Sequence, residues 1–136
     1  MIAYQCKNSK IAGTDFKEVA RKARLFFHSI ESRTKRQPYI RSAYFDKEKI
    51  FLNYFWPHLD QKSRRERLKR LVYLSCAIEL IEYSRAKPTS KIDPNQKDEL
   101  FHRFTGLTKK KELFYVQIKE DLKSKKKYLM SVFPPE

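Results

Sequence analysis

The sequence predicts an α+β domain in which an antiparallel sheet of four to five strands packs against two main helices. Three observations predict it: a helical apolar period near the N-terminus, a second helical stretch in the middle, and aromatic and β-branched runs that dominate the C-terminal third. A chain of 136 residues can bury one hydrophobic core but not two. We therefore expect residues 1–136 to form a single domain.

Two helices are predicted. After a short lead-in, residues 1–13, apolar side chains recur at spacings of three and four over residues 16–30, as in a helix with one buried face. Asp15, with Glu18 three residues later, is a suitable N-cap. The second helix is expected over residues 61–83, with its first turns rich in Lys and Arg and its later turns mostly apolar.

The strands are predicted from aromatic and β-branched runs bounded by turn residues. One hairpin precedes the second helix and ends at Trp56-Pro57, because proline cannot continue a strand ladder. A proline-containing loop, residues 84–98, separates the second helix from the C-terminal strands. The five predicted strands cover residues 39–45, 50–55, 100–105, 113–119 and 126–133.

The charge of the chain indicates a polyanionic partner. Lys and Arg number 31 against 16 Asp and Glu, which leaves a formal net charge of +15. Nucleic acid relieves such repulsion by releasing its condensed counterions. An acidic protein, a membrane surface or solubility alone are the alternatives that the charge leaves open.

The sequence disfavours several classes of protein: membrane-spanning, disulfide-stabilised, and cofactor- or metal-binding. No apolar run is long enough to span a membrane, and Cys6 and Cys76 lack the spacing of a disulfide framework, which predicts a reducing, cytoplasmic location. There is no glycine-rich phosphate loop, and the three histidines are not in a paired ligand spacing. We therefore expect no cofactor and no metal.

The polar residues of the predicted C-terminal strands suit metal-independent RNA cleavage. His102 is a candidate acid or base, Arg103 a bidentate phosphate ligand, Lys119 a cation for the developing charge, and Ser131 a donor to a phosphate oxygen. The ribose 2′-OH is the nucleophile, so the expected product is a 2′,3′-cyclic phosphate. Each of the four also has a structural interpretation, His102 as a half-buried histidine and Ser131 as a small filler.

Other residues are candidates for holding the nucleic acid. Tyr39, Tyr44, Tyr54 and Tyr115 could stack on bases while lysines follow the phosphates. The predicted nucleic-acid-binding residues are Arg41, Tyr44, Lys109, Lys110, Lys111, Gln117 and Lys126.

Three C-terminal segments, "LFHRFTG", "ELFYVQIKED" and "KKYLMSVFPP", resemble the C-terminal sheet of the barnase–EndoU–colicin–RelE superfamily of ribonucleases, in particular its phage- and mobile-element-associated branch. The resemblance implies a metal-independent endoribonuclease, often a toxin, with an acidic antitoxin or immunity protein as partner. It is a resemblance of pattern over about the last forty residues. The alternatives are a non-catalytic nucleic-acid-binding accessory protein of a mobile element and an interaction protein that docks an acidic partner.

Overall fold

The computed structural model describes residues 2–136, and within that range it contains four helices and seven strands. The helices are α1 (Phe16–Glu31), α2 (Phe55–Asp60), α3 (Arg64–Leu71) and α4 (Leu74–Tyr83). The strands are β1 (Tyr4–Gln5), β2 (Tyr39–Arg41), β3 (Lys49–Phe51), β4 (Thr89–Ile92), β5 (Glu99–Leu107), β6 (Leu113–Asp121) and β7 (Lys127–Phe133). The α+β class predicted from the sequence is confirmed.

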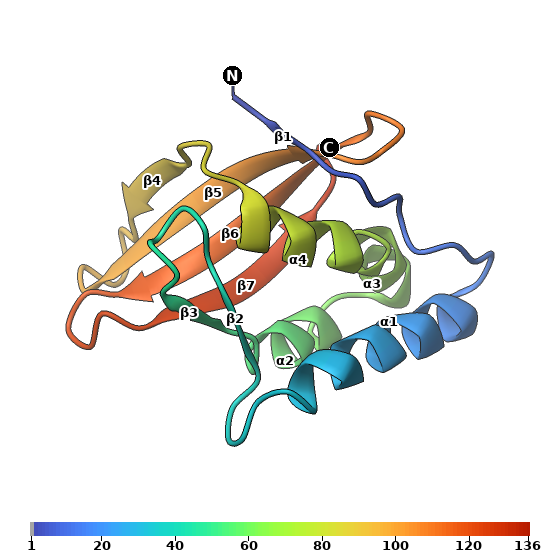
Figure 1. Cartoon of the computed structure of the whole chain (residues 1–136), viewed down its shortest axis with the longest axis horizontal. Helices are drawn as coiled ribbons and strands as arrows, with labels where there is room; N and C mark the ends of the chain where they lie inside the picture. Colours follow the sequence, from blue (N-terminus) through green and yellow to red (C-terminus); the bar gives the residue numbers. More distant parts are fainter. Residues whose placement is uncertain (1) are drawn as a thin grey trace.

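The strands form one curled sheet with the order β1-β5-β6-β7-β3-β2, and β4 pairs with the first half of β5 (Figure 1). The pairs β4–β5, β5–β6, β6–β7 and β2–β3 are antiparallel, whereas β1–β5 and β3–β7 are parallel. The prediction of an antiparallel sheet of four to five strands therefore needs correction, because the sheet is mixed and larger. The added strands, β1 and β4, lie in the expected lead-in and the expected loop and are too short to show a period.

The first predicted helix is confirmed and the second is corrected. The Asp15 carboxylate accepts a hydrogen bond from the Glu18 amide at 2.9 Å, so the predicted cap starts α1. The stretch over residues 61–83 divides into α3 and α4 at Tyr73, whose ring stacks on Phe114 in the core. The helix α4 is buried on most sides, whereas Arg64, Arg65 and Lys69 of α3 are exposed.

The fourth helix, α2, replaces the end of a predicted strand. The strand expected over residues 50–55 ends at Phe51, and α2 begins at Phe55. Pro57 falls in the first turn of α2, where its missing N–H sacrifices no helical hydrogen bond. The expectation of two main helices is thus corrected to four within residues 2–136.

The hydrophobic core lies between the sheet and the helices: α4 lies in front of the sheet in Figure 1, and α1 lies below α4 and packs against α3, α4 and β2. Alternate residues of β5, β6 and β7 point into it, among them Phe104, Phe114 and Leu129. Packing is tight at Gly106, where an added Cβ would lie 2.4 Å from the Phe114 ring. Because strand side chains alternate, the intervening residues form a second face that α1 and α4 do not cover.

No helix within residues 2–136 combines the length and the apolar character that a bilayer span requires.

Candidate nucleic-acid interface

The face of the sheet that points away from α1 and α4 carries mostly aromatic, basic and amide side chains; we call it the outer sheet face. The strand register brings these residues together: Arg103 lies opposite Gln117, Phe101 opposite Lys119, and Tyr128 opposite both Lys119 and Phe51. Its aromatic, basic and neutral polar members include Tyr39, Arg41, Lys49, Phe51, Lys91, Phe101, Arg103, Tyr115, Gln117, Lys119, Tyr128, Ser131 and Phe133. By the same alternation the acidic residues Glu99 and Asp121, which lie opposite each other, also belong to this face.

Four aromatic rings form a continuous row across β2, β3 and β7, which we call the aromatic row. The ring centroids are 6.2 Å apart for Tyr39 and Phe51, 5.9 Å for Phe51 and Tyr128, and 4.7 Å for Tyr128 and Tyr54. Tyr54, from the segment between β3 and α2, is 41% exposed. Burial raises the pKa of the Tyr128 hydroxyl further above its ordinary value. The row offers flat apolar surfaces of the kind on which unpaired bases stack.

A second aromatic group lies at the other end of β6 and β7. The rings of Tyr115 and Phe133 are 5.6 Å apart, and the Arg103 guanidinium lies 5.7 Å from the first centroid and 5.1 Å from the second. Arg70, reaching from α3, lies 5.5 Å from the Phe133 centroid and donates from Nη1 to Ser131 Oγ at 2.7 Å. Ser131 is thus buried beneath an arginine that is itself near the surface.

Cations interleave with the aromatic row. Lys49 Nζ lies 4.6 Å from the Tyr39 centroid, and Lys126 Nζ lies 5.9 Å from that of Phe51. Lys119 Nζ lies over Tyr54 and Tyr128, at 5.4 and 5.8 Å, and pairs with Glu99 at 3.0 Å. Cations over aromatic rings combine affinity for phosphate with surfaces for stacking, which are the two needs of a single-stranded nucleic-acid site.

Two hollows lie at opposite margins of the outer sheet face. One, of about 590 Å³, lies beside β2 and β3 and is lined by Tyr39, Lys49 and Phe51 together with the loop 33–37 and Lys126. The other, of about 380 Å³, lies beside β4 and β5 and is lined by Lys91, Phe101, Arg103 and Gln117 among others. With strands about 4.8 Å apart, the face between the margins is roughly 24 Å wide, enough for several nucleotides.

The structure places six of the predicted site residues on or beside the outer sheet face: Arg41, Arg103, Gln117, Lys119, Lys126 and Ser131. Gln117 Oε1 accepts from Arg103 Nη2 at 3.3 Å, which joins two of them directly. Arg41 is exposed and donates from Nη1 to the Lys47 carbonyl at 3.0 Å.

His102 lies on the opposite face of the sheet, 6% exposed. One ring nitrogen is 2.7 Å from Ser90 Oγ on β4 and the other 2.9 Å from Glu120 Oε1 on β6. Lys127 Nζ continues this network, 3.6 Å from Glu120 and 2.9 Å from Glu48. The predicted acid or base is therefore separated from Arg103, Lys119 and Ser131 by the sheet itself and ties three strands together.

The other predicted binding residues also lie elsewhere. Tyr44 packs edge-on against Phe45 and Phe104, on the core side of the sheet. Lys109, Lys110 and Lys111 are exposed in the turn between β5 and β6, the orange loop at the upper right of Figure 1. That turn lies far from the cyan loop before β2, which is at the bottom of the same view.

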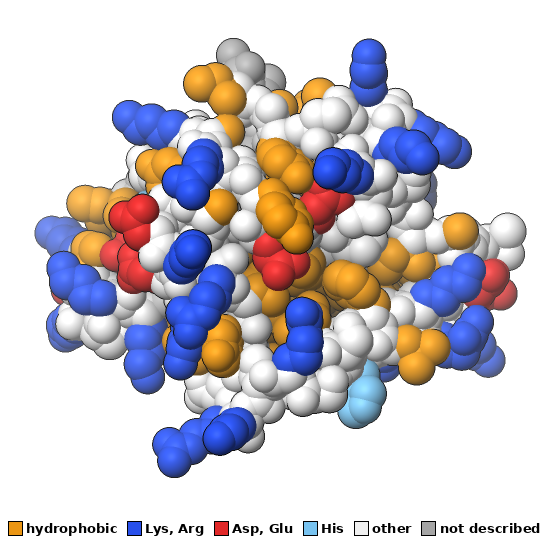
Figure 2. All heavy atoms as spheres, in the orientation of Figure 1, with side chains coloured by type: hydrophobic (Ala, Val, Ile, Leu, Met, Phe, Trp, Pro, Cys, Tyr) orange, Lys and Arg blue, Asp and Glu red, His pale blue; other side chains and the backbone are white. Residues whose placement is uncertain are grey.

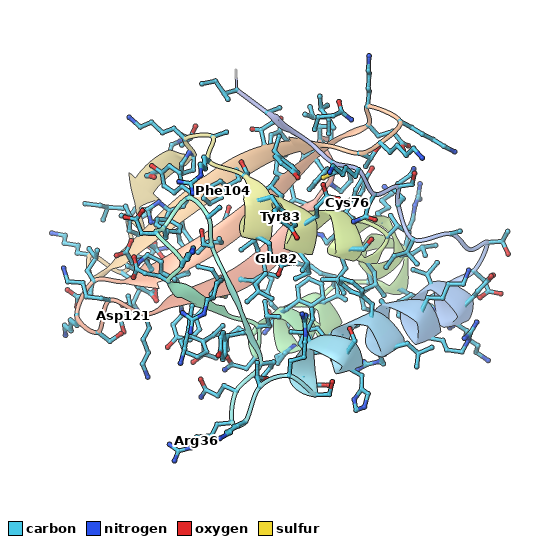
Figure 3. All side chains as sticks on the ribbon, in the orientation of Figure 1. Arg36, Cys76, Glu82, Tyr83, Phe104 and Asp121 are labelled. Carbon is cyan, nitrogen blue, oxygen red and sulfur yellow. The ribbon has the colours of Figure 1, made fainter. Side chains whose placement is uncertain are left out.

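The face of the molecule on which α4 lies, which we call the helix side, differs from the outer sheet face in the arrangement of its surface side chains. Figure 2 shows this side, with hydrophobic and acidic side chains in its middle and Lys and Arg distributed mainly around them. Tyr83, labelled in Figure 3, is 66% exposed here without a row of neighbouring rings. The helices also carry cation–aromatic contacts, Arg24 with Trp56 at 4.1 Å and both Arg64 and Arg67 with Phe16 at 5.2 Å. These contacts are separate from one another and are not part of a row of rings.

Comparison with known proteins finds no match. No family model, no curated protein and no solved structure is similar enough to this chain to be matched to it. The resemblance to the ribonuclease superfamily therefore stays a prediction.

Several residues of this surface were not singled out from the sequence. Phe51, Tyr128 and Phe133 are read in sequence as ordinary strand aromatics, and Arg70 as one charge of a basic helix. The strict alternation of β6 was the usable signal. In β7, Tyr128 and Phe133 are an odd number of positions apart, and only the register shift opposite Gln117 and Ile118 places both on the outer sheet face. Arg70 gave no such signal, because its position depends on how α3 packs beside β7.

Proposed function

We propose that this protein binds single-stranded RNA on its outer sheet face, without cleaving it. The observation that carries the proposal is the interleaving of the aromatic row with Lys49, Lys119 and Lys126. A bound strand would stack its bases on the rings and place its phosphates near the lysines. Bases stack on aromatic side chains only when they are unpaired, which favours a single strand over a duplex.

What supports binding over cleavage is the location of His102. A general acid or base must come within hydrogen-bond reach of the proton that it transfers, and His102 has both ring nitrogens occupied on the far side of the sheet. Cleavage by the predicted set of four residues would require that histidine to leave its network. The non-catalytic alternative drawn from the sequence needs no such change.

An acidic protein partner, including the predicted antitoxin or immunity protein, would use the same cations but would not need the aromatic row. The two kinds of partner therefore differ in their dependence on Tyr54. Base stacking contributes about 1–3 kcal/mol per base, so we expect Tyr54→Ala to weaken RNA binding roughly 5- to 30-fold for a loss of about 1–2 kcal/mol.

The test is fluorescence anisotropy with a labelled RNA of about ten nucleotides, a length within the site sizes of such proteins. Tyr54 makes no capping hydrogen bond to α2, so its truncation leaves the helix start intact. Tyr83→Ala is the control, since it removes a tyrosine from the helix side that is more exposed than Tyr54, 66% against 41%. Equal losses for the two variants, or no binding by the unaltered protein, would refute the proposal.

A further inference from the structure

The larger of the two hollows differs from the rest of the outer sheet face in its charge. The loop that follows α1 forms its outer wall, and Arg36 projects from that loop at the bottom of Figure 3. Among residues 2–136, no acidic side chain lines it. We call it the cationic hollow; its basic residues are Arg33, Lys35, Arg36, Lys49 and Lys126.

The charges of the cationic hollow are not neutralised by the protein. Across the described chain, residues 2–136, none of these five side chains forms an ion pair, whereas Lys10, Lys119 and Lys127 each have a carboxylate partner. Bringing five like charges around one space is unfavourable unless an anion occupies it. These five cations therefore favour an anion that carries more negative charge than a single phosphodiester.

The floor of the cationic hollow is aromatic. Tyr39 and Phe51, the end of the aromatic row, line it together with the cations. Its volume of about 590 Å³ falls in the range of ligand pockets, roughly 300–1,000 Å³. The hollow therefore suits one base, stacked on the aromatic floor, and one phosphate group, in contact with the basic walls.

The position of the hollow favours the end of a strand over its middle. β2 is the last strand of the sheet on this side, and the loop 33–37 rises beyond it as a wall. A phosphomonoester carries a charge of about −1.5 to −2 near neutral pH, against −1 for a phosphodiester. We propose that the cationic hollow binds a phosphorylated end of the RNA strand whose body lies on the outer sheet face. This inference rests on the proposed RNA binding and adds specificity for one chemical group to it.

The experiment compares RNAs of one sequence, about ten nucleotides long, that carry a 5′-phosphate, a 3′-phosphate or hydroxyl groups at both ends. We expect one phosphorylated form to bind roughly tenfold more tightly than the hydroxyl form, which corresponds to about 1.4 kcal/mol. The double variant Lys35→Ala/Arg36→Ala, altered only at exposed loop residues, should lose this preference. Lys17→Ala/Arg21→Ala removes the same charge from the exposed side of α1 and should keep it.

The outcomes separate this inference from the proposed function. If the three RNAs bind equally well and Tyr54→Ala still weakens binding, the phosphate-end site is wrong and RNA binding stands. Loss of the preference in both double variants would also overturn the site, since a general charge effect would then explain it. If no RNA binds at all, both proposals fail together.

Discussion

Replacing His102 with alanine distinguishes a structural histidine from a residue of the RNA site. The ring is 6% exposed, bonds Ser90 on β4 and Glu120 on β6, and lies 5.0 Å from the Phe45 ring. Without it, Glu120, whose side chain is 14% exposed, keeps Lys127 at 3.6 Å as its partner. The substitution thus leaves a nearly buried carboxylate with one of its two interactions.

The expected loss of stability follows from these contacts. A hydrogen bond to a charged group contributes about 1.5–3 kcal/mol, and the cavity left by the ring adds about 1 kcal/mol. Ser90 is exposed, so water replaces its lost partner at little cost. The sum is a destabilisation of about 2.5–4 kcal/mol, or a fall of roughly 1.2–2 M in the urea midpoint for an m value near 2 kcal/mol/M.

Urea unfolding followed by circular dichroism measures this change, and RNA anisotropy without urea measures binding by the folded variant. We expect His102→Ala to bind RNA within about twofold of the unaltered protein, because the outer sheet face is on the other side. Ser90→Ala is the control and should cost only about 0.5–1 kcal/mol. A variant as stable as the original, or a stable variant that loses RNA binding, would refute the structural role.

Four further outcomes are expected. Gly106→Ala should lower the free energy of unfolding by at least about 1–3 kcal/mol, because its Cβ would lie 2.4 Å from Phe114; unchanged stability would contradict the packing described. Arg103→Ala should weaken RNA binding and make the plot of log affinity against log salt less steep by about 0.7, whereas an unchanged slope would remove Arg103 from the phosphate path. Burial and neighbouring cations lower the pKa of His58, so the unfolded chain takes up a proton first as the pH falls. The contribution of His58 to stability should therefore diminish as the pH drops through the ordinary histidine pKa of 6.5, and His58→Gln should make the stability less dependent on pH there. Labelled RNA should stay intact on incubation with the protein, with or without EDTA; EDTA-resistant cleavage to a cyclic phosphate would restore the ribonuclease hypothesis.

The elements with a clear period were predictable from the sequence. The helix α1 and the strand β6 each show their period over at least seven residues, and the cap at Asp15 follows from local chemistry alone. The strands β5 and β7 were predictable as apolar and aromatic runs, although the alternation of β7 is interrupted by a register shift. The break between α3 and α4 was not predictable, because it arises from the stacking of Tyr73 on Phe114, forty-one positions further along the chain (114 − 73). The parallel pairs of β1 and β3 are likewise set by tertiary packing.

The site was predictable in composition and only partly in position. Alternation along β5 requires that His102 and its neighbour Arg103 lie on opposite faces, but it does not say which face meets the helices. Phe104 and Gly106 share the face of His102. Phe104 packs on the rings of Tyr44 and Phe45, and Gly106 lies against Phe114 and against Leu80 of α4, so this face meets the core. In the cationic hollow, the loop 33–37 lies close in sequence to β2 and β3, but Lys126 comes from the turn before β7. No local pattern indicates that Lys126 joins them.

Ultraviolet crosslinking of the unaltered protein to a uridine-rich RNA of about ten nucleotides, followed by mass spectrometry of the linked peptides, tests the central claim most directly. Binding on the outer sheet face predicts crosslinks at Tyr54, Tyr128 and Phe133, whose rings offer stacking surfaces. Crosslinks confined to Tyr83 on α4 or Trp56 on α2 would contradict it.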